Sequence, residues 1–247
     1  MEIKNKIATI SRQTIRKEKA VIEALEAAVD DDFCEGVAAI YASEGRVVVT
    51  GIGKSALIAR KIVATLNSTG TPALFMHAAD AIHGDLGMIQ PDDMILCLSK
   101  SGETAEIKVL VPMLKNLGHR LIGMVSRRDS YLGQQSDFVF HTPVSEEADP
   151  NNLAPTSSTT AQLVMGDAVA MSLLALRGFS PGDFAQLHPG GALGKQLYLR
   201  VSDLYVQHER PAVPSDAGLR SVIVEMTSRR LGATAVLNEQ EEVLGII

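Results

Sequence analysis

The chain has little of what marks several large classes of protein. It contains no Trp, and aromatic residues make up only 4% of its 247 residues. Its net charge is −6, with no excess of basic residues. Binding to nucleic acid needs a basic surface that displaces counterions from phosphates, so we expect no nucleic-acid partner. A single site on an acidic protein can still be positive, and a small anionic ligand therefore remains compatible with this composition.

Cysteine and long apolar runs are also scarce. The only cysteines are Cys34 and Cys97, too few and too far apart for a disulfide framework, which fits a reducing compartment. Residues 1–6 lack the apolar stretch of a signal peptide. No continuous apolar run approaches the roughly 18 residues that span a bilayer. The sequence thus predicts a cytoplasmic protein without a membrane partner.

What is present is an alternation of short apolar runs with helical patterns. Helices are predicted over the first forty residues, where Ile3, Ile7 and Ile10 have helical spacing. Strands that are apolar on both faces alternate with further helices, which is typical of an α/β fold with a doubly wound parallel five-stranded sheet. The predicted strands are 46–50, 73–76, 94–98, 121–125 and 138–141, and the predicted later helices cover 55–67, about 107–117 and 159–176.

The composition changes near residue 200. A polar stretch containing Pro211 and Pro214 precedes a short apolar-faced helix at about 219–226, then a strand pair at 233–237 and 243–247. We interpret residues 1–200 as one domain and residues 203–247 as a fragment of a second.

Two loops follow strand ends, where ligands bind in parallel sheets. The first is Gly51-Ile52-Gly53-Lys54-Ser55. It is not a P-loop, because Val48 stands where that motif needs Gly. A dinucleotide fingerprint fits only weakly, through Gly51, Gly53, Ala56 and the later Asp80, and a tight turn without a ligand is the alternative.

The second loop is Ser99-Lys100-Ser101-Gly102-Glu103-Thr104. Its hydroxyls and the free N–H groups at the start of the next helix suit an anion, and Gly102 allows close approach of the backbone. Two such loops after two parallel strands predict a phosphate-binding site to which Ser55, Ser99, Ser101 and Thr104 contribute.

Three other segments carry candidate residues. His77 and His83 lie near two Asp residues and could be metal ligands, general acids or capping groups. Acids at 146–149 precede a hydroxyl run at 156–160, which we expect to cap the long helix and aim its N-terminus at the site. A glycine-rich turn at 186–194 carries His188, and a bare turn is the alternative there.

These motifs together resemble the arabinose 5-phosphate isomerases of the SIS (sugar isomerase) domain family. The resemblance covers residues 20–200 and rests on six blocks in order: 51–55, 68–72, 83–88, 99–103, 153–160 and 188–194. It implies interconversion of D-ribulose 5-phosphate and D-arabinose 5-phosphate through a cis-enediol, for the synthesis of Kdo in lipopolysaccharide. Another SIS-domain sugar-phosphate isomerase, or a non-catalytic sugar-phosphate sensor, is the alternative.

The resemblance also implies roles for single residues. By position, the catalytic residues are Lys54, Glu106, Glu147 and His188, and further substrate contacts come from Gly70, Thr71, His77 and His83. His77 matches a position associated with inhibitory zinc. Lys100 stands where the family often carries Asn, and it could add charge to phosphate binding or point outward. No cofactor is required for such an isomerisation.

For the mechanism we expect His188 or Glu147 to be the carbon base, with the other handling oxygen protons. A carboxylate shielded from water would have a raised pKa that suits this work. Lys54 would offset negative charge, and Glu106 would orient Lys54. The resemblance further implies a homo-oligomer, tetramer or dimer, and a partial first CBS repeat at 203–247.

Overall fold

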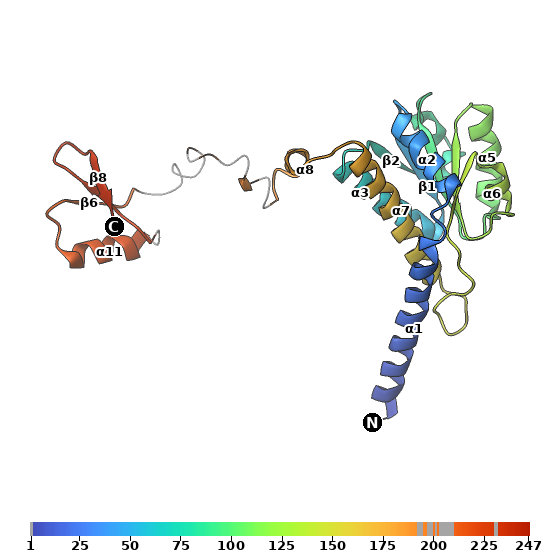
Figure 1. Cartoon of the computed structure of the whole chain (residues 1–247), viewed down its shortest axis with the longest axis horizontal. Coiled ribbons are helices and arrows are strands. Elements are labelled where there is room, and N and C mark those ends of the chain that lie inside the picture. The colour runs from blue at the N-terminus through green and yellow to red at the C-terminus, as the bar shows by residue number, and fades with distance from the viewer. Residues whose placement is uncertain (1, 192–194, 197–199, 201, 203–209, 230–231) are drawn as a thin grey trace. The chain divides into compact units, whose positions relative to one another are not determined.

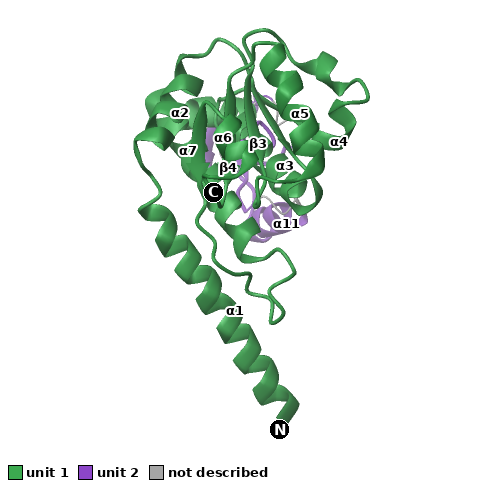
Figure 2. Ribbon diagram, turned by 90° about the vertical axis from the view of Figure 1, so that its right-hand side faces the viewer, with its two compact units in different colours: residues 1–187 green, residues 188–247 purple. Residues whose placement is uncertain are grey.

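The computed structural model describes residues 2–191, 195–196, 200, 202, 210–229 and 232–247. The chain divides into two compact units, residues 1–187 and residues 188–247, which are coloured separately in Figure 2. The expected domain boundary near residue 200 falls inside the second unit, and residues 203–209 of the expected repeat lie outside the described residues.

The first unit is built on a five-stranded sheet in the order β2-β1-β3-β4-β5. All four strand pairs are parallel, as the apolar runs predict. Strands β1, β3 and β4 are buried at every residue because helices cover both faces. The strands are β1 (Val47–Gly51), β2 (Ala73–His77), β3 (Met94–Leu98), β4 (Leu121–Val125) and β5 (Phe138–His141).

The helices of this unit lie in two layers, one on each side of the sheet (Figure 1). The predicted helices are confirmed as α1, α2, α3, α5 and α7, whereas α4, η1, α6 and α8 were not predicted. In chain order the segments are α1 (Glu2–Glu26), α2 (Asp31–Ala42), α3 (Gly53–Ser68), α4 (Ala78–Ala81), η1 (Asp85–Met88), α5 (Ala105–Asn116), α6 (Tyr131–Gln135), α7 (Ser157–Leu176) and α8 (Pro181–Leu187).

Alternation along the strands divides the core in two. Val47 and Val49 of β1 point toward the layer of α2, α3 and α7, whereas Val48 joins the layer of α4, α5 and α6. Successive side chains of a strand point to opposite faces, so each buried strand supplies both cores. The sheet is therefore fixed from both sides, and its carboxyl edge is a rigid base for loops.

Helix α7 is long and mostly apolar. Among the described residues it is the one helix whose length and mean hydropathy of 1.4 would suffice to cross a membrane. Its apolar character has a structural reason, because nine of its residues are buried and it packs against α1, α2 and α3. The hydroxyl and small residues at its start broke the apolar run in the sequence.

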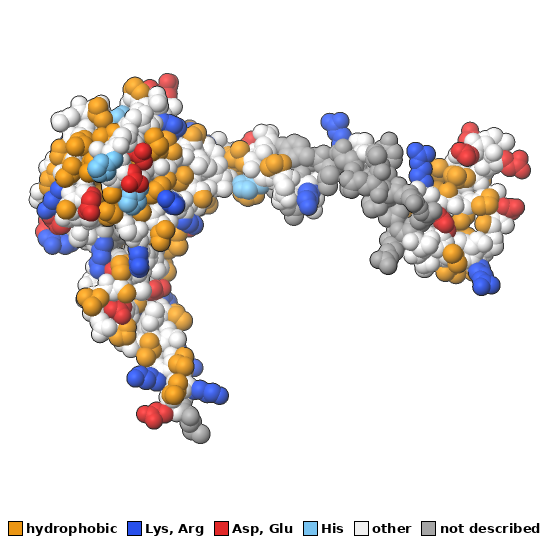
Figure 3. All heavy atoms as spheres, turned by 180° about the vertical axis from the view of Figure 1, so that it is seen from behind, with side chains coloured by type: hydrophobic (Ala, Val, Ile, Leu, Met, Phe, Trp, Pro, Cys, Tyr) orange, Lys and Arg blue, Asp and Glu red, His pale blue; other side chains and the backbone are white. Residues whose placement is uncertain are grey.

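Helix α1 differs from the others because most of it projects away from the sheet (Figure 1). Of its 25 residues only Leu25 is buried, and Ile3 is 75% exposed. Hydrophobic side chains therefore line the projecting part between basic and acidic ones (Figure 3).

The second unit contains β6 (Ala212–Pro214), α11 (Leu219–Arg229), β7 (Ala235–Leu237) and β8 (Val243–Ile246). Strands β6 and β7 pair in parallel, and β7 and β8 pair antiparallel. The predicted helix and strand pair are confirmed. Strand β6 was missed because two prolines flank its short apolar core.

Candidate active site

A pocket of about 220 Å³ lies at the carboxyl ends of β1 and β3. The two loops that the sequence singles out both line it, as expected for loops at the carboxyl ends of neighbouring parallel strands. Its lining residues are Ile52, Lys54, Ser55, Leu98, Ser99, Lys100, Ser101, Thr104, Pro155 and Ser158.

Glycines shape the turn after β1. A Cβ on Gly51 would lie only 3.2 Å from the carbonyl oxygen of Leu98, so a side chain there would push β1 away from β3. Gly53 has φ of +58°, a left-handed conformation that disfavours other residues. The turn delivers Lys54 and Ser55 to the first turn of α3, where unpaired N–H groups attract anions. Among the described residues, none forms an ion pair with Lys54.

The loop after β3 is held by its own hydroxyl groups. Ser99 is 4% exposed, its Oγ accepts a hydrogen bond from the N–H of Gly102 at 3.1 Å, and it lies 3.1 Å from Oγ1 of Thr104. Gly102 has φ of +66° and leaves no room for a Cβ beside Ser130. Ser99 therefore shapes the loop. Ser101 and the N-terminus of α5 are more accessible as hydrogen-bond donors to an anion.

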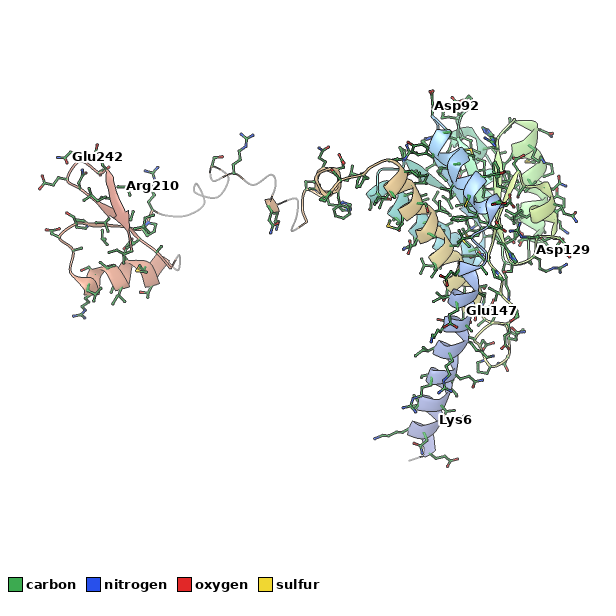
Figure 4. The ribbon with its side chains drawn as sticks, in the orientation of Figure 1. Lys6, Asp92, Asp129, Glu147, Arg210 and Glu242 are labelled. Carbon is green, nitrogen blue, oxygen red and sulfur yellow. The ribbon has the colours of Figure 1, made fainter. Side chains whose placement is uncertain are left out.

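Glu147 binds residues on two sides of the pocket, Lys100 of the phosphate loop and Ser158 at the start of α7. Its side chain is 2% exposed and both carboxylate oxygens accept several hydrogen bonds. Oε1 accepts from Nζ of Lys100 at 2.7 Å and from Oγ of Ser158 at 2.6 Å. Oε2 accepts from the N–H groups of Thr156 at 2.8 Å and Ser158 at 3.1 Å. Glu147 thus caps the start of α7, at the end of the unit from which α1 projects (Figure 4).

This environment corrects the expected pKa of Glu147. Burial raises the pKa, as expected, and is the largest single cause. The hydrogen bonds from Lys100, Ser158 and the N–H of Thr156 act against it and together outweigh it, which leaves a pKa of about 2. The expectation of a raised pKa was wrong because it counted the burial and not the donors. Glu147 is an ionised carboxylate at neutral pH.

Lys100 does not simply point outward, and its expected contribution to phosphate binding stays a prediction. It lines the pocket, and its Nζ pairs with Glu147 across the space between two loops that are 47 residues apart in the chain. The sequence did not reveal this pair, because nothing in the spacing of the two residues indicates contact. The sequence feature closest to this contact was the hydroxyl run at 156–160, which was expected to cap α7. In the structure Glu147 accepts hydrogen bonds from two of the N–H groups at that helix start.

The loop that carries Glu147 is itself well bonded. The N–H of Glu147 donates to Oδ1 of Asn152 at 2.7 Å, and Asn152 has a left-handed φ of 55°. The N–H of Ala148 donates to Oγ1 of Thr156 at 2.8 Å. Glu146 pairs with Lys17 of α1 at 3.0 Å, so the adjacent acid is a surface residue.

The two remaining catalytic candidates are Glu106 and His188. Glu106 is half-buried on the first turn of α5, and the described contacts include no ion pair between it and Lys54, so the expected orienting contact is not observed. His188 is the first residue of the second unit and is half-buried there. Residues 192–194 of its motif lie outside the described residues.

The two other candidate histidines, His77 and His83, lie at the end of β2 and after it. His77 is the last residue of that strand, opposite Gly51, and its Nδ1 lies 3.6 Å from Oδ2 of Asp80. His83 is exposed after α4. No group of three or more His, Cys, Asp or Glu side chains is placed to hold a metal ion within the described part of the chain. A zinc contact of His77 stays a prediction.

Gly70 and Thr71 lie at the other edge of the sheet, because α3 has returned the chain to the amino end of β2 before residue 73. Gly70 has φ of +83°, and a Cβ there would lie 2.6 Å from the ring of Phe179. The N–H of Thr71 donates to the carbonyl of Leu66 at the end of α3. Within one chain these contacts are structural, and the two residues do not line the pocket.

The fold and the pocket define a class of protein: a doubly wound parallel α/β domain with a pocket between two strand-to-helix loops. The SIS domain family model matches residues 40–172. The chain is 47% identical over 237 residues to arabinose 5-phosphate isomerase KdsD of Pseudomonas aeruginosa, covering 96% of this chain and 73% of that protein. It is 43% identical to arabinose 5-phosphate isomerase KpsF of Escherichia coli O6:H1, covering 98% and 74%.

A solved structure agrees with these relatives. A protein of Escherichia coli CFT073 in complex with arabinose 5-phosphate superposes with a TM-score of 0.70 and 40% identity, covering 75% of this chain and 98% of that one. The chain therefore belongs to the SIS domain family and, within it, to the family of the arabinose 5-phosphate isomerases.

Proposed function

We propose that this protein is an isomerase that interconverts D-arabinose 5-phosphate and D-ribulose 5-phosphate and supplies Kdo synthesis. The observation that carries the proposal is the pocket in which Lys54, Ser55 and Ser101 converge at two helix N-termini. The names of the relatives and the ligand in the similar solved structure support the substrate class.

Phosphate binding follows from the donors in that pocket. A sugar phosphate would place its phosphate oxygens at the N–H groups of α3 and α5, with hydroxyls of Ser55, Ser101 and Thr104 around them. Ser99 would contribute by holding the loop. Lys54 is the lysine of the pocket whose charge is not neutralised by a described carboxylate, so it is available to offset negative charge on the substrate.

The isomerisation moves a proton between C1 and C2 through a cis-enediol, which needs a base and stabilisation of developing charge but no cofactor. We assign the carbon base to His188 because the family resemblance marks it as catalytic and an imidazole can accept and return a proton. Glu147 is too weak a base at a pKa of about 2 for the same task. Lys54 would offset negative charge on the enediolate or on the phosphate, and Glu106 stays a proposed catalytic residue.

Other expected properties are proposals of the same kind. The β6-α11-β7-β8 order of the second unit supports a partial CBS repeat. The long exposed apolar face of α1 supports a homo-oligomer, tetramer or dimer. Cys34 and Cys97 are both unpaired, which supports a cytoplasmic location.

The test is isomerase kinetics of the purified chain on a panel of pentose and hexose phosphates. We expect the highest kcat/KM with arabinose 5-phosphate and ribulose 5-phosphate. Preference for another sugar phosphate would point to a different SIS-domain isomerase, and tight binding without turnover would point to a sensor. Either result would refute the proposal.

The base assignment has its own test. We expect His188→Ala to lower turnover by about 10² to 10⁴, the usual cost of removing a proton-transfer group. Circular dichroism checks that the variant is folded. Turnover within twofold of the parent protein would exclude His188 as the base.

A further inference from the structure

Lys100 and Glu147 join two loops that are 47 residues apart in the chain. Lys100 follows β3 in the phosphate loop, and Glu147 precedes α7. Their side chains meet at 2.7 Å between Nζ and Oε1, with Glu147 2% exposed and Lys100 39% exposed toward the pocket. The pair therefore joins a buried carboxylate to a residue that lines the pocket.

The other donors to this carboxylate are neutral. Ser158 and Thr156 supply a hydroxyl and two N–H groups from the first turn of α7. These bonds orient the carboxylate, and the helix N-terminus adds only a partial positive charge. Among the described residues, Lys100 supplies the full positive charge in contact with Glu147, and a buried carboxylate without a cation is strongly disfavoured.

We propose that Lys100 is a positioning residue of the isomerase: its bond to Glu147 ties the phosphate loop to the start of α7 and fixes the shape of the pocket. This inference rests on the proposed function for its catalytic consequence. The positive charge of Lys100 is paired with the carboxylate of Glu147, so Lys54 is the cation available to the substrate. Lys100 therefore acts through Glu147 and the two loops, without contacting the reacting atoms.

The competing role is direct binding of the substrate phosphate. A lysine that gripped the phosphate would contribute to substrate affinity, so its loss would raise KM. A lysine that fixes the geometry of both loops would contribute mainly to turnover, because misplaced catalytic groups slow the chemical step. The split between kcat and KM therefore separates the two roles.

The first experiment compares Lys100→Met and Lys100→Arg in the full chain. We expect Lys100→Met to lower kcat at least tenfold with KM changed less than threefold, and Lys100→Arg to recover most of the lost turnover. Lys61→Met is the matched control, because Lys61 pairs with Asp167 on the exposed surface. Unchanged turnover in Lys100→Met, a loss confined to KM, or no recovery by Arg would overturn the proposal.

The second experiment does not depend on activity. A double-mutant cycle of Lys100→Met and Glu147→Gln, followed by chemical unfolding, measures the coupling of the pair. We expect a coupling of at least tenfold in the folding equilibrium constant, against less than about fivefold for Lys61→Met with Asp167→Asn. Equal coupling in the two cycles would overturn the proposal. If the parent protein shows no isomerase activity, the proposed function fails, and this cycle still tests the pair.

Discussion

Two buried carboxylates stand at opposite edges of the same sheet and are built alike. Asp93 directly precedes β3. Glu147 binds Lys100, which follows the carboxyl end of β3 and lines the pocket. Asp92, the neighbour of Asp93, and Glu147 lie at opposite ends of the unit in Figure 4. Each carboxylate accepts hydrogen bonds from one cation and two backbone N–H groups, and in each the pKa is lowered although burial raises it.

The difference lies in the cation. Arg46 binds Asp93 with two side-chain nitrogens at 3.1 and 2.7 Å and also donates to the carbonyl of Met88. This fork fixes the amino ends of β1 and β3 with directional bonds. Lys100 offers Glu147 a single charged group that also faces a pocket. The comparison teaches that the same chemistry secures the frame at one edge and shapes a binding site at the other.

The largest expected effect is on turnover, which should depend on Glu147 and not on Asp93. We expect Glu147→Gln to lower turnover by about 10², because the amide keeps the shape but leaves Lys100 without a counter-charge at the pocket. Asp93→Asn should leave turnover per folded molecule within about twofold, since its described partners, Arg46 and Gln90, do not line the active-site pocket. Steady-state kinetics corrected for the folded fraction measures both. Equal losses in the two variants would end the distinction between frame and site.

The next prediction concerns the stability of the fold, to which we expect Asp93 to contribute. We expect Asp93→Asn to lower the free energy of unfolding by about 2 kcal/mol, since Arg46 loses its ionised partner and the strand ends lose a shared acceptor. Denaturant unfolding measures the change. Arg46→Lys is the matched variant and should cost less, because it keeps the charge and loses only the fork. A cost below about 0.5 kcal/mol for Asp93→Asn would show that the frame does not depend on this pair.

A smaller effect is expected from pH. Both carboxylates have a pKa below the ordinary value in the folded protein, and that of Glu147 is about 2. Such groups stabilise the fold above the pKa of the unfolded chain, and the stabilisation is lost as the pH falls. We expect stability to fall by about 1–2 kcal/mol between roughly pH 5 and pH 2. Glu147→Gln should flatten this slope, and an identical slope in that variant would exclude Glu147 as its source.

The smallest effect sharpens the description of the pocket. We expect Ser101→Ala to raise KM by about threefold, the loss of one hydrogen bond to a charged ligand group, with kcat little changed. Ser136→Ala is the control, because that hydroxyl only donates to the carbonyl of Leu132 in α6. Steady-state kinetics on arabinose 5-phosphate compares the two. An unchanged KM in Ser101→Ala would remove this hydroxyl from the phosphate site.

Much of the frame could be predicted from the sequence because it depends on local patterns. Apolar runs with glycine turns gave all five strands of the main sheet. The turns at Gly51 and Gly102 pointed to the pocket, since they follow strands that must run parallel. Strand β6 and the short helix α4 could not be predicted in the same way, because each is too short for a periodic signal.

The contacts that define the site were less accessible. The expected pKa of Glu147 was wrong because its value depends on donors from Lys100 and Ser158, which are distant in sequence. Gly70 and Thr71 lie near Ser55 in the chain, yet α3 carries them to the other edge of the sheet.

The sequence by itself determined the parallel α/β fold, the two loops at strand ends and the family, because these follow from local spacing and from short motifs. The tertiary structure alone decided that Lys100 pairs with Glu147 and that Glu147 stays ionised. Both outcomes depend on the balance between burial and hydrogen bonds at one point in space, and that balance is set by residues from three separate segments.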